Sequence, residues 1–336
     1  MCGICGMVMR GDRPVDRPRL NAMVRSLRHR GPDGEDTVVN GRVGLGHTRL
    51  AIIDLATGDQ PLEGSRGEHL VVNGEIYNHV ELRTELADYP FQTRSDSEVV
   101  LPLWQRHGLD FGRRLRGMYA LALHELEADR VVLARDRFGI KPLYVAELPQ
   151  ATLFASELRA ILASGWLAAA VDPARAADLL DRQYVAGSAT IVPGIRRLAP
   201  GERLVIAGGQ TVDRRIQRWD DDAGGAGDPA ALDRLLMASV EVHQRADVPY
   251  GLFLSGGIDS TSVLAAMARL NAQPVQAFSL GFSRAGVHDE RPAAAAAAAA
   301  VGAHLHALDY DEGDFLRHLP ATVAATDDPL ADYAIL

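Results

Sequence analysis

The 336-residue sequence contains only two cysteines, Cys2 and Cys5, both within the opening stretch MCGICG. Two cysteines provide no disulfide framework, which fits a reducing compartment. Their Cys-x-x-Cys spacing occurs in zinc and redox sites, but the sequence has no second cysteine pair and no His-x₃₋₅-His pair to complete a zinc site. No strand precedes them, as one would in a thioredoxin-type redox pair. We interpret Cys5 as a small buried hydrophobic residue and expect a separate role for Cys2.

Long apolar runs and excess positive charge are also missing. No stretch reaches the roughly 18 residues of a membrane-spanning helix, and the alanine run at 293–300 is short. Residues 1–20 mix acidic, basic and proline residues, so we expect no secretory signal. The net charge of -9 argues against a nucleic-acid or membrane-surface partner. We expect a cytoplasmic protein.

The sequence is rich enough in apolar residues, at 47%, to build a sizeable core, and its length suggests two domains. Helices are expected at 79–86 and 95–108, where Ser95 and Glu98 form a capping-box pattern. Short β-rich runs parted by turn residues predict antiparallel sheets with helices layered outside, an α+β fold. These runs are 43–53, 69–77, 117–125, 130–136, 143–148 and 152–158.

The pattern changes after residue 206. Residues 207–229 are rich in Gly and Asp and poor in apolar residues, which predicts a linker. Helices and strands are then expected to alternate, which predicts a partial α/β doubly wound domain with a parallel sheet over 230–336. The expected helices are 230–245, the part of 250–270 after its Gly-rich turn, and 289–301, and the expected strands open 250–270 and cover 275–282 and 304–310.

The stretch SGGIDS (255–260) follows an apolar strand and opens a helix. Glycines there let the backbone approach a phosphate, and helix N-terminal amides and serine hydroxyls donate hydrogen bonds to it. The stretch lacks the Gly-Lys-Ser/Thr of a P-loop and the Gly-x-Gly-x-x-Gly of a dinucleotide site. It resembles the pyrophosphate loop, SGGxDS, of ATP pyrophosphatases, and Asp259 would help to hold Mg²⁺ beside the substrate phosphates.

Cys2 can act as a nucleophile if the initiator Met1 is removed. Its own α-amino group, with a pKa of roughly 8, would then serve as the general base. A thiol paired with a terminal amine is a known route to an activated nucleophile and needs no histidine.

With Cys2-Gly3-Ile4, several other stretches resemble class II glutamine amidotransferase domains. Together with the second domain, the order of these stretches identifies the chain as similar to glutamine-hydrolysing asparagine synthetases. The resemblance gives an amidotransferase domain at 1–206, a linker at 207–229 and a partial synthetase domain at 230–336. The stretches are RHRGPDGED (28–36), GLGHTRLAIIDLATGDQPL (44–62), VVNGEIYNHVELRTEL (71–86), RSDSEVVL (94–101), RGMYALALHE (116–125), ARDRFGIKPLYV (134–145) and FASELRAIL (154–162).

The resemblance implies a role for each matching residue. Cys2 would attack the glutamine amide, and the Asn73 side chain and the Gly74 amide would stabilise the oxyanion. Arg49 would bind the glutamine α-carboxylate, and Asp96, with Glu75 nearby, its α-ammonium group. The implied glutamine-binding set is Arg49, Ile52, Asn73, Gly74, Glu75 and Asp96, and the implied ATP-binding set is Leu254, Ser255, Gly256, Gly257, Asp259, Ser260, Leu280 and Gly281.

The second domain would form β-aspartyl-AMP from aspartate and ATP with Mg²⁺, and ammonia from glutamine would convert it to asparagine. The stretch TDDPLADYAIL (326–336) resembles a DEPxAD segment that lies partway through the family's synthetase domain. The acidic Gly-rich motif and the lysine that follow it in the family are not among the 336 residues, so we expect only part of that domain here.

Three alternatives stay open. The acceptor is aspartate, or it is another carboxylate of a specialised pathway, or the chain is a glutaminase alone or a truncated partner of an intact homologue. A homodimer is also left open.

Overall fold

The structure is a computed structural model that describes residues 1–217, 228–282 and 288–330. Its contacts divide the chain into two units, which we describe separately. Unit 1 comprises Met1–Ala223 together with Thr326–Asp332, and unit 2 comprises Gly224–Ala325 together with Tyr333–Leu336. No helix among the described residues is long and apolar enough to cross a membrane.

Unit 1 contains two six-stranded sheets packed face to face. The first has the order β10-β8-β9-β1-β3-β2, and the second the order β12-β11-β7-β6-β5-β4. Every pairing between these strands is antiparallel, as predicted. The strands are β1 (Gly3–Met9), β2 (Gly34–Asn40), β3 (Val43–Arg49), β4 (Leu62–Glu63), β5 (His69–Ile76), β6 (Gly117–Glu125), β7 (Arg130–Arg135), β8 (Tyr144–Glu147), β9 (Ala151–Ala155), β10 (Arg196–Arg197), β11 (Glu202–Ala207) and β12 (Gln210–Ile216).

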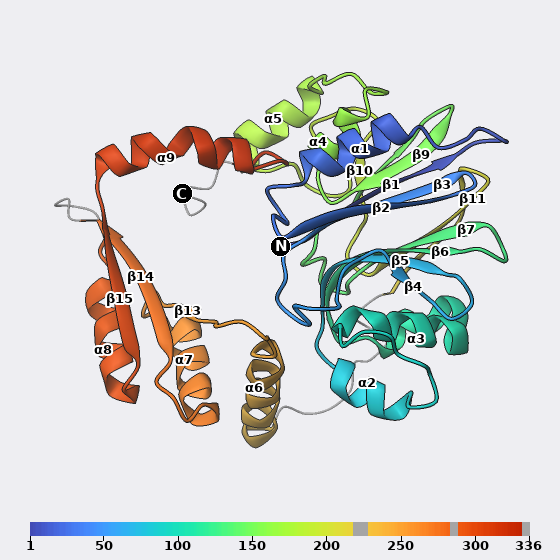
Figure 1. The fold of residues 1–336 in the computed structure, drawn as a ribbon. Helices are drawn as coiled ribbons and strands as arrows, with labels where there is room; N and C mark the ends of the chain where they lie inside the picture. The colour runs from blue at the N-terminus through green and yellow to red at the C-terminus, as the bar shows by residue number, and fades with distance from the viewer. Residues whose placement is uncertain (218–227, 283–287, 331–336) are drawn as a thin grey trace. The chain divides into compact units, whose positions relative to one another are not determined.

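Helices cover the outer faces of both sheets (Figure 1). The first sheet packs against α1 (Arg17–Ser26) and α4 (Leu158–Ala163), and the second packs against α2 (His79–Glu85) and α3 (Val100–His107). A third cluster, which includes Ile4, Val8, Val71 and Leu133, fills the space between the sheets. Unit 1 is therefore a four-layer α+β sandwich, with short 3₁₀ helices at Asp96–Val99 and Gly108–Arg114 and a further helix α5 (Pro173–Arg182).

Strand β1 contributes to two different cores because successive side chains point to opposite faces of a strand. Ile4 and Val8 belong to the cluster between the sheets, whereas Cys5, Met7 and Met9 belong to the cluster beneath α1 and α4. The two cysteines, three positions apart, consequently lie on opposite sides of this strand.

Two local details differ from the sequence-based expectations. Ser95 does accept a hydrogen bond from the Ser97 amide, but Glu98 accepts from the amides of Gln92 and Thr93 and does not complete a capping box. Strand β12 occupies residues 210–216, inside the range predicted as linker. Its sparse apolar content suits an exposed edge strand, held by pairing with β11. The rest of the predicted linker falls largely on 218–227, outside the described residues.

Unit 2 contains a parallel sheet of β13 (Leu252–Phe253), β14 (Gln276–Phe282) and β15 (His304–Tyr310). Its helices are α6 (Pro229–His243), α7 (Ile258–Leu270), α8 (Arg291–Val301) and α9 (Glu312–Ala325). The predicted parallel sheet is confirmed. In the described residues, an apolar cluster covers one face of the sheet, while Phe253 and Leu308 are 89% and 57% exposed, so double winding is not seen there.

Candidate functional site

One pocket of unit 1 brings together every residue expected to bind glutamine. It is lined by Cys2, Arg49, Ile52, Asn73, Gly74, Glu75 and Asp96, together with Met1, Ser95, Ser97 and Lys141 among others. The alternation of side chains along the strands explains why these residues face the same pocket. Asn73 and Val71 lie on the same face of β5, and Val71 faces the other sheet. Cys2 shares the parity of Ile4, which also faces the space between the sheets.

The thiol of Cys2 is half-buried and held at the end of β3. Its Sγ lies 3.4 Å from the Leu50 amide, which donates to it, and 3.6 Å from the Leu50 carbonyl oxygen. Burial raises the pKa of the Cys2 thiol, although the hydrogen bond from Leu50 and the nearby N-terminal charge oppose this. The thiol is therefore protonated near neutral pH and needs a base. None of the described residues that line the pocket is a histidine.

Asn73 is fully buried, and neither its amide nitrogen nor its amide oxygen has a hydrogen-bond partner. An unpaired buried amide costs roughly 1–3 kcal/mol, and such groups are rare in folded proteins. This one lines the same pocket as Cys2, so a ligand in the pocket could satisfy it. Gly74 follows, and an added Cβ there would lie 2.1 Å from the Met118 carbonyl oxygen, which explains the glycine.

Two carboxyl groups, Glu75 and Asp96, face the pocket from β5 and from the 3₁₀ helix after Ser95. Burial raises the pKa of Asp96, even though its Oδ2 accepts a 2.6 Å hydrogen bond from the Ile76 amide. Burial and the charge of Asp96 raise the pKa of Glu75. A cation placed between the two carboxylates would relieve this repulsion, as a ligand ammonium group can.

Arg49 is 8% exposed, and its Nη1 donates to the exposed Asp59 carboxylate at 2.7 Å. Its Nη2 donates to the carbonyl oxygen of Asp54. A side-chain carboxylate thus occupies one edge of this guanidinium. One nitrogen of the guanidinium is therefore already oriented to hold a carboxylate oxygen, while the other is held by backbone carbonyl oxygens.

Lys141 is a pocket residue to which the sequence analysis gave no role. It is 6% exposed, its Nζ lies 3.3 Å from the Met1 sulfur, and burial lowers its pKa. The available signal was a lone lysine within the apolar stretch FGIKPLYV. A buried lysine beside Glu75 partly balances the two carboxyl groups of the pocket.

In unit 2 the predicted SGGIDS loop lies between β13 and α7. Ser255 Oγ is 3.0 Å from Ser260 Oγ and accepts from the Gly257 amide at 3.3 Å. The β13–β14 register places Leu280 and Gly281 beside the end of β13, where the loop begins. Ligands of parallel sheets bind at these carboxyl ends of strands. Asp259 is exposed in the first turn of α7, with the backbone amides of that turn.

Gly256 is tightly constrained, since its φ is +79° and an added Cβ would lie 2.6 Å from the Ala294 amide nitrogen. We expect Gly256→Ala to destabilise unit 2 and to abolish the ATP binding that the resemblance implies for this loop, as measured by calorimetry and denaturant unfolding. Gly302 is the matched control, because its φ is +72° but its Cβ position is open. Gly302→Ala should cost about 1–2 kcal/mol of unfolding free energy and leave ATP binding intact. Equal effects of the two variants would contradict this prediction.

Comparison with known proteins agrees with this geometry. A family profile described as "Glutamine amidotransferase domain" matches residues 1–219, and one described as "Asparagine synthase" matches residues 231–336. The chain belongs to the glutamine-hydrolysing asparagine synthetase family. The resemblance inferred from the sequence is thereby confirmed.

Similar members of the family differ in what their names describe. Asparagine synthetase [glutamine-hydrolyzing] 1 of Bacillus subtilis (strain 168) is 32% identical over 351 residues, covering 100% of this chain and 54% of that protein. Amidase chry2 of Gibberella zeae is 30% identical over 370 residues, covering 99% of this chain and 54% of that protein. The chain thus spans about half the length of these relatives.

A solved structure, that of the allosteric regulatory enzyme of purine biosynthesis, has a similar fold. It superposes with a TM-score of 0.50 at 18% identity, covering 92% of this chain and 80% of that chain. At this identity the similarity concerns the fold alone.

Asp96 gives a testable link between stability and function. Its pKa is raised above the ordinary 3.8, so the folded state binds more protons than the unfolded state between the two values. The unfolding free energy therefore falls as pH rises through this window, and the ionised carboxylate destabilises the fold at neutral pH. We expect Asp96→Asn to raise stability at pH 7. If Asp96 binds the glutamine ammonium group, as the resemblance implies, the same change should raise the KM for glutamine by about 100-fold or more, through loss of a charge-assisted contact worth about 3 kcal/mol.

Urea unfolding and glutaminase kinetics at pH 7 would check both effects. Asp213 is the control, because a hydrogen bond from Arg203 lowers its pKa on an exposed edge strand. Asp213→Asn should not raise stability and should leave the KM unchanged. A stabilised Asp96→Asn variant with a normal KM would remove Asp96 from the binding site.

Proposed function

We propose that this chain hydrolyses glutamine at Cys2 and belongs to an ATP-dependent amidotransferase whose acceptor is aspartate. One observation carries the glutaminase proposal: Asn73, buried with both polar side-chain atoms unpaired, lines the same pocket as the Cys2 thiol. A buried donor without a partner is suited to an oxyanion that exists only during the reaction.

The chemistry follows from the pocket. The Cys2 sulfur would attack the side-chain amide carbon of glutamine, and its proton would pass to the α-amino group of the same residue. Asn73 and the Gly74 amide would stabilise the oxyanion, and the protonated amine would return the proton to the leaving ammonia. Water would then hydrolyse the thioester to glutamate and regenerate the thiol.

This mechanism requires removal of Met1, because in the described structure the Cys2 nitrogen lies in a peptide bond. An ordinary α-amino group has a pKa of roughly 8, so the free amine of Cys2 would supply the base that the raised pKa of its thiol requires. Arg49 would bind the glutamine carboxylate in place of Asp59, and Asp96 with Glu75 would bind its ammonium group.

For unit 2 we propose ATP binding at the SGGIDS loop. Ser255, Ser260 and the amides at the start of α7 would bind phosphate oxygens, and Leu254, Leu280 and Gly281 would lie near the nucleotide. No group of three metal-ligating side chains occurs among the described residues. Asp259 fits a Mg²⁺ ion that takes its other ligands from phosphates and water, and bound Mg²⁺ would neutralise phosphate charge.

Activation of aspartate as β-aspartyl-AMP would release pyrophosphate, and ammonia would displace AMP to give asparagine. The name of the Bacillus subtilis relative supports asparagine as the product and hence aspartate as the acceptor, whereas the name of Amidase chry2 does not mention asparagine and leaves another acceptor open. The two candidate acceptors can be told apart by asking which carboxylate substrate makes pyrophosphate release from ATP occur.

The test combines two assays on the purified chain. We expect glutamate and ammonia from glutamine alone, and aspartate-dependent release of pyrophosphate from ATP, Mg²⁺ and ammonium. Glutamine hydrolysis without any aspartate-dependent release would reject activation of aspartate by this chain and leave glutaminase as its activity. Absence of glutamine hydrolysis, in protein shown by mass spectrometry to begin at Cys2, would reject the glutaminase proposal itself.

A further inference from the structure

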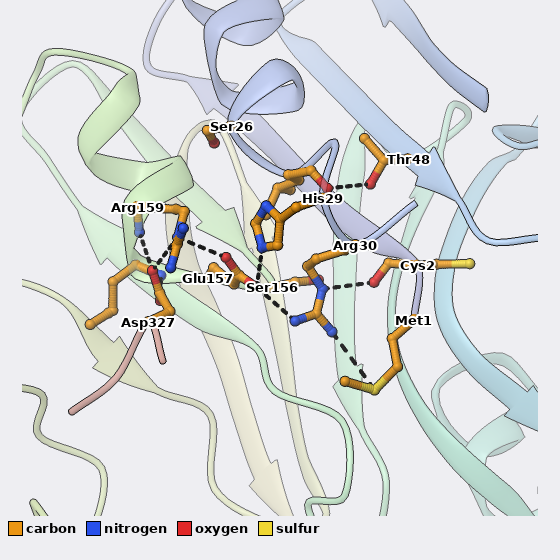
Figure 2. Close-up of polar contacts among 12 residues, drawn as sticks. Met1, Cys2, Ser26, His29, Arg30, Thr48, Ser156, Glu157, Arg159 and Asp327 are labelled. Carbon is orange, nitrogen blue, oxygen red and sulfur yellow. Dashed lines mark hydrogen bonds and ion pairs between the residues drawn. The ribbon is translucent and has the colours of Figure 1, made fainter. Parts of the chain in front are cut away.

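A chain of charged side chains, buried except for Arg159 at 34% exposed, connects residue 327 to the nucleophile residue, entirely within unit 1 (Figure 2). Arg30 Nε donates to the Cys2 carbonyl oxygen at 2.9 Å, and its Nη1 donates to Glu157 Oε1 at 2.7 Å. Glu157 Oε2 lies 3.0 Å from Arg159 Nε, which in turn donates to Asp327 Oδ1 at 3.0 Å. The side chains of Arg30, Glu157 and Asp327 are 9%, 5% and 10% exposed.

The central part of this chain is rigidly placed next to β1. The Ser156 amide donates to the Ile4 carbonyl oxygen at 2.8 Å, and the Ile4 amide donates to Ser156 Oγ at 3.0 Å. Glu157 therefore follows a residue that is fixed two positions from Cys2. The Glu157 carboxylate contacts both Arg30 Nη1 and His29 Nε2, so a change in its orientation reaches the Arg30 guanidinium.

Asp327 is held by more than Arg159. Its carboxylate accepts from the amides of Leu158 and Arg159 at the start of α4. Burial raises the pKa of Asp327, so its ionised form depends on these donors and on Arg159. The neighbouring Asp328 anchors the same segment separately, through Tyr144 Oη at 2.9 Å and through Arg197 Nε.

Arg30 and Arg159 carry the positive charges along this chain, and Glu157 and Asp327 carry the negative ones; His29 Nε2 also lies 3.1 Å from Glu157 Oε1. Loss of the Asp327 charge removes one carboxylate from Arg159 and leaves Glu157 in contact with both guanidinium groups. Arg159 would then compete with Arg30 for Glu157, and a buried ion pair with a missing partner is strongly perturbed. The predicted consequence is a looser Arg30 and a less well placed Cys2 carbonyl.

We propose that Asp327 is a positioning residue for glutamine hydrolysis, acting through Arg159, Glu157 and Arg30 on the backbone of Cys2. This inference rests on the proposed glutaminase function. Residues 326–330 lie within the range matched by the asparagine synthase profile, yet they belong to unit 1 in the structure. The contact thus makes the rate of hydrolysis depend on how a segment of the synthetase sequence is docked.

The primary experiment measures glutaminase kinetics of Asp327→Asn. We expect kcat to fall about 10-fold with a KM within about 2-fold of wild type, because misplacement of a reacting group by a fraction of an ångström is costly while the binding residues stay in place. Arg159→Gln removes the competing guanidinium and leaves Asp327 on the two amides, so its kcat should stay near wild type, and Arg159→Gln/Asp327→Asn should lose less than Asp327→Asn alone. A wild-type kcat in Asp327→Asn, or an equal loss in the double variant, would overturn the proposal.

Two further variants separate positioning from simple anchoring. Asp328→Asn removes bonds to Tyr144 and Arg197 but leaves the chain to Cys2, so its kcat should stay near wild type. An equal loss of kcat in Asp328→Asn and Asp327→Asn would show that the segment only needs to be anchored, and would overturn the positioning role of Asp327. The double variant Glu157→Gln/Asp327→Asn should be no slower than Glu157→Gln alone, whereas additive losses would show that the residues act independently.

A measurement that does not use glutamine tests the positioning role of Asp327 separately from the proposed glutaminase function. The rate of Cys2 alkylation by iodoacetamide should differ between wild type and Asp327→Asn, and Cys5 is too buried to interfere. If the wild type hydrolyses no glutamine, the proposed function fails, and an altered alkylation rate still supports the positioning role. Unaltered alkylation together with unaltered kcat rejects the positioning role alone.

Discussion

Replacement of Cys2 with alanine is expected to abolish glutamine hydrolysis. The thiol is the nucleophile of the proposed reaction, and none of the other described residues that line the pocket offers a thiol. Ammonia release, followed with a coupled assay, should fall to the background of the buffer. Binding of glutamine should persist in the variant, since Arg49, Glu75 and Asp96 are unchanged.

Cys5→Ala is the matched control for this prediction. Cys5 is fully buried in the core beneath α1 and α4, on the opposite face of β1 from the pocket. Its replacement removes one buried sulfur, which should cost about 1 kcal/mol of unfolding free energy and leave kcat within a few-fold of wild type. Persistent hydrolysis in Cys2→Ala, or an equally deep loss in Cys5→Ala, would contradict the assignment of Cys2.

The second large effect is expected for Asn73→Ala. Loss of one oxyanion donor lowers kcat by about 100- to 1,000-fold in comparable sites, and the KM for glutamine should change little because the contact forms mainly in the transition state. The same change should cost little stability, since it removes a buried amide that has no partner in the folded protein. Steady-state kinetics and urea unfolding test the two halves of this prediction.

Asn78 provides the opposite case within the same domain. Its Nδ2 donates to the Arg114 carbonyl oxygen and its Oδ1 accepts from the Arg116 amide, each at 2.9 Å. Asn78→Ala should therefore lower stability by about 1–2 kcal/mol and leave kcat unchanged. If Asn73→Ala keeps nearly full kcat, the unpaired amide must be explained in some other way than as an oxyanion donor.

The sequence predicted the parts of the fold that depend on local pattern. Short β-rich runs bounded by turn residues were sufficient for β5, β6 and β14, and the turn glycines of SGGIDS were sufficient for the junction of β13 and α7. The helix α1 and the strand β2 were not predicted. Strand β12 was taken for a linker because its stability comes from pairing with β11, which the local composition does not reveal.

The glutamine pocket was predictable for a different reason. Nothing in the local sequence around any one pocket residue points to glutamine binding. Only the resemblance to a known family assigned a shared site to Cys2, Arg49, Asn73 and Asp96. The pocket residues come from segments that are far apart in the sequence and meet only in the folded protein, so their spacing does not reveal the site. Likewise, Arg30 and Glu157 are 127 residues apart, and Arg159 and Asp327 are 168 apart, so no spacing in the sequence indicates either pair.

The alternation along β1 has a consequence for oxidative damage. Side chains on opposite faces of one strand cannot bring their sulfur atoms to bonding distance without disrupting the strand. If Cys2 is oxidised to a sulfenic acid, Cys5 cannot capture it as an internal disulfide, and further oxidation would be irreversible. Recovery of the thiol would depend on a small-molecule or protein reductant that reaches the pocket from outside.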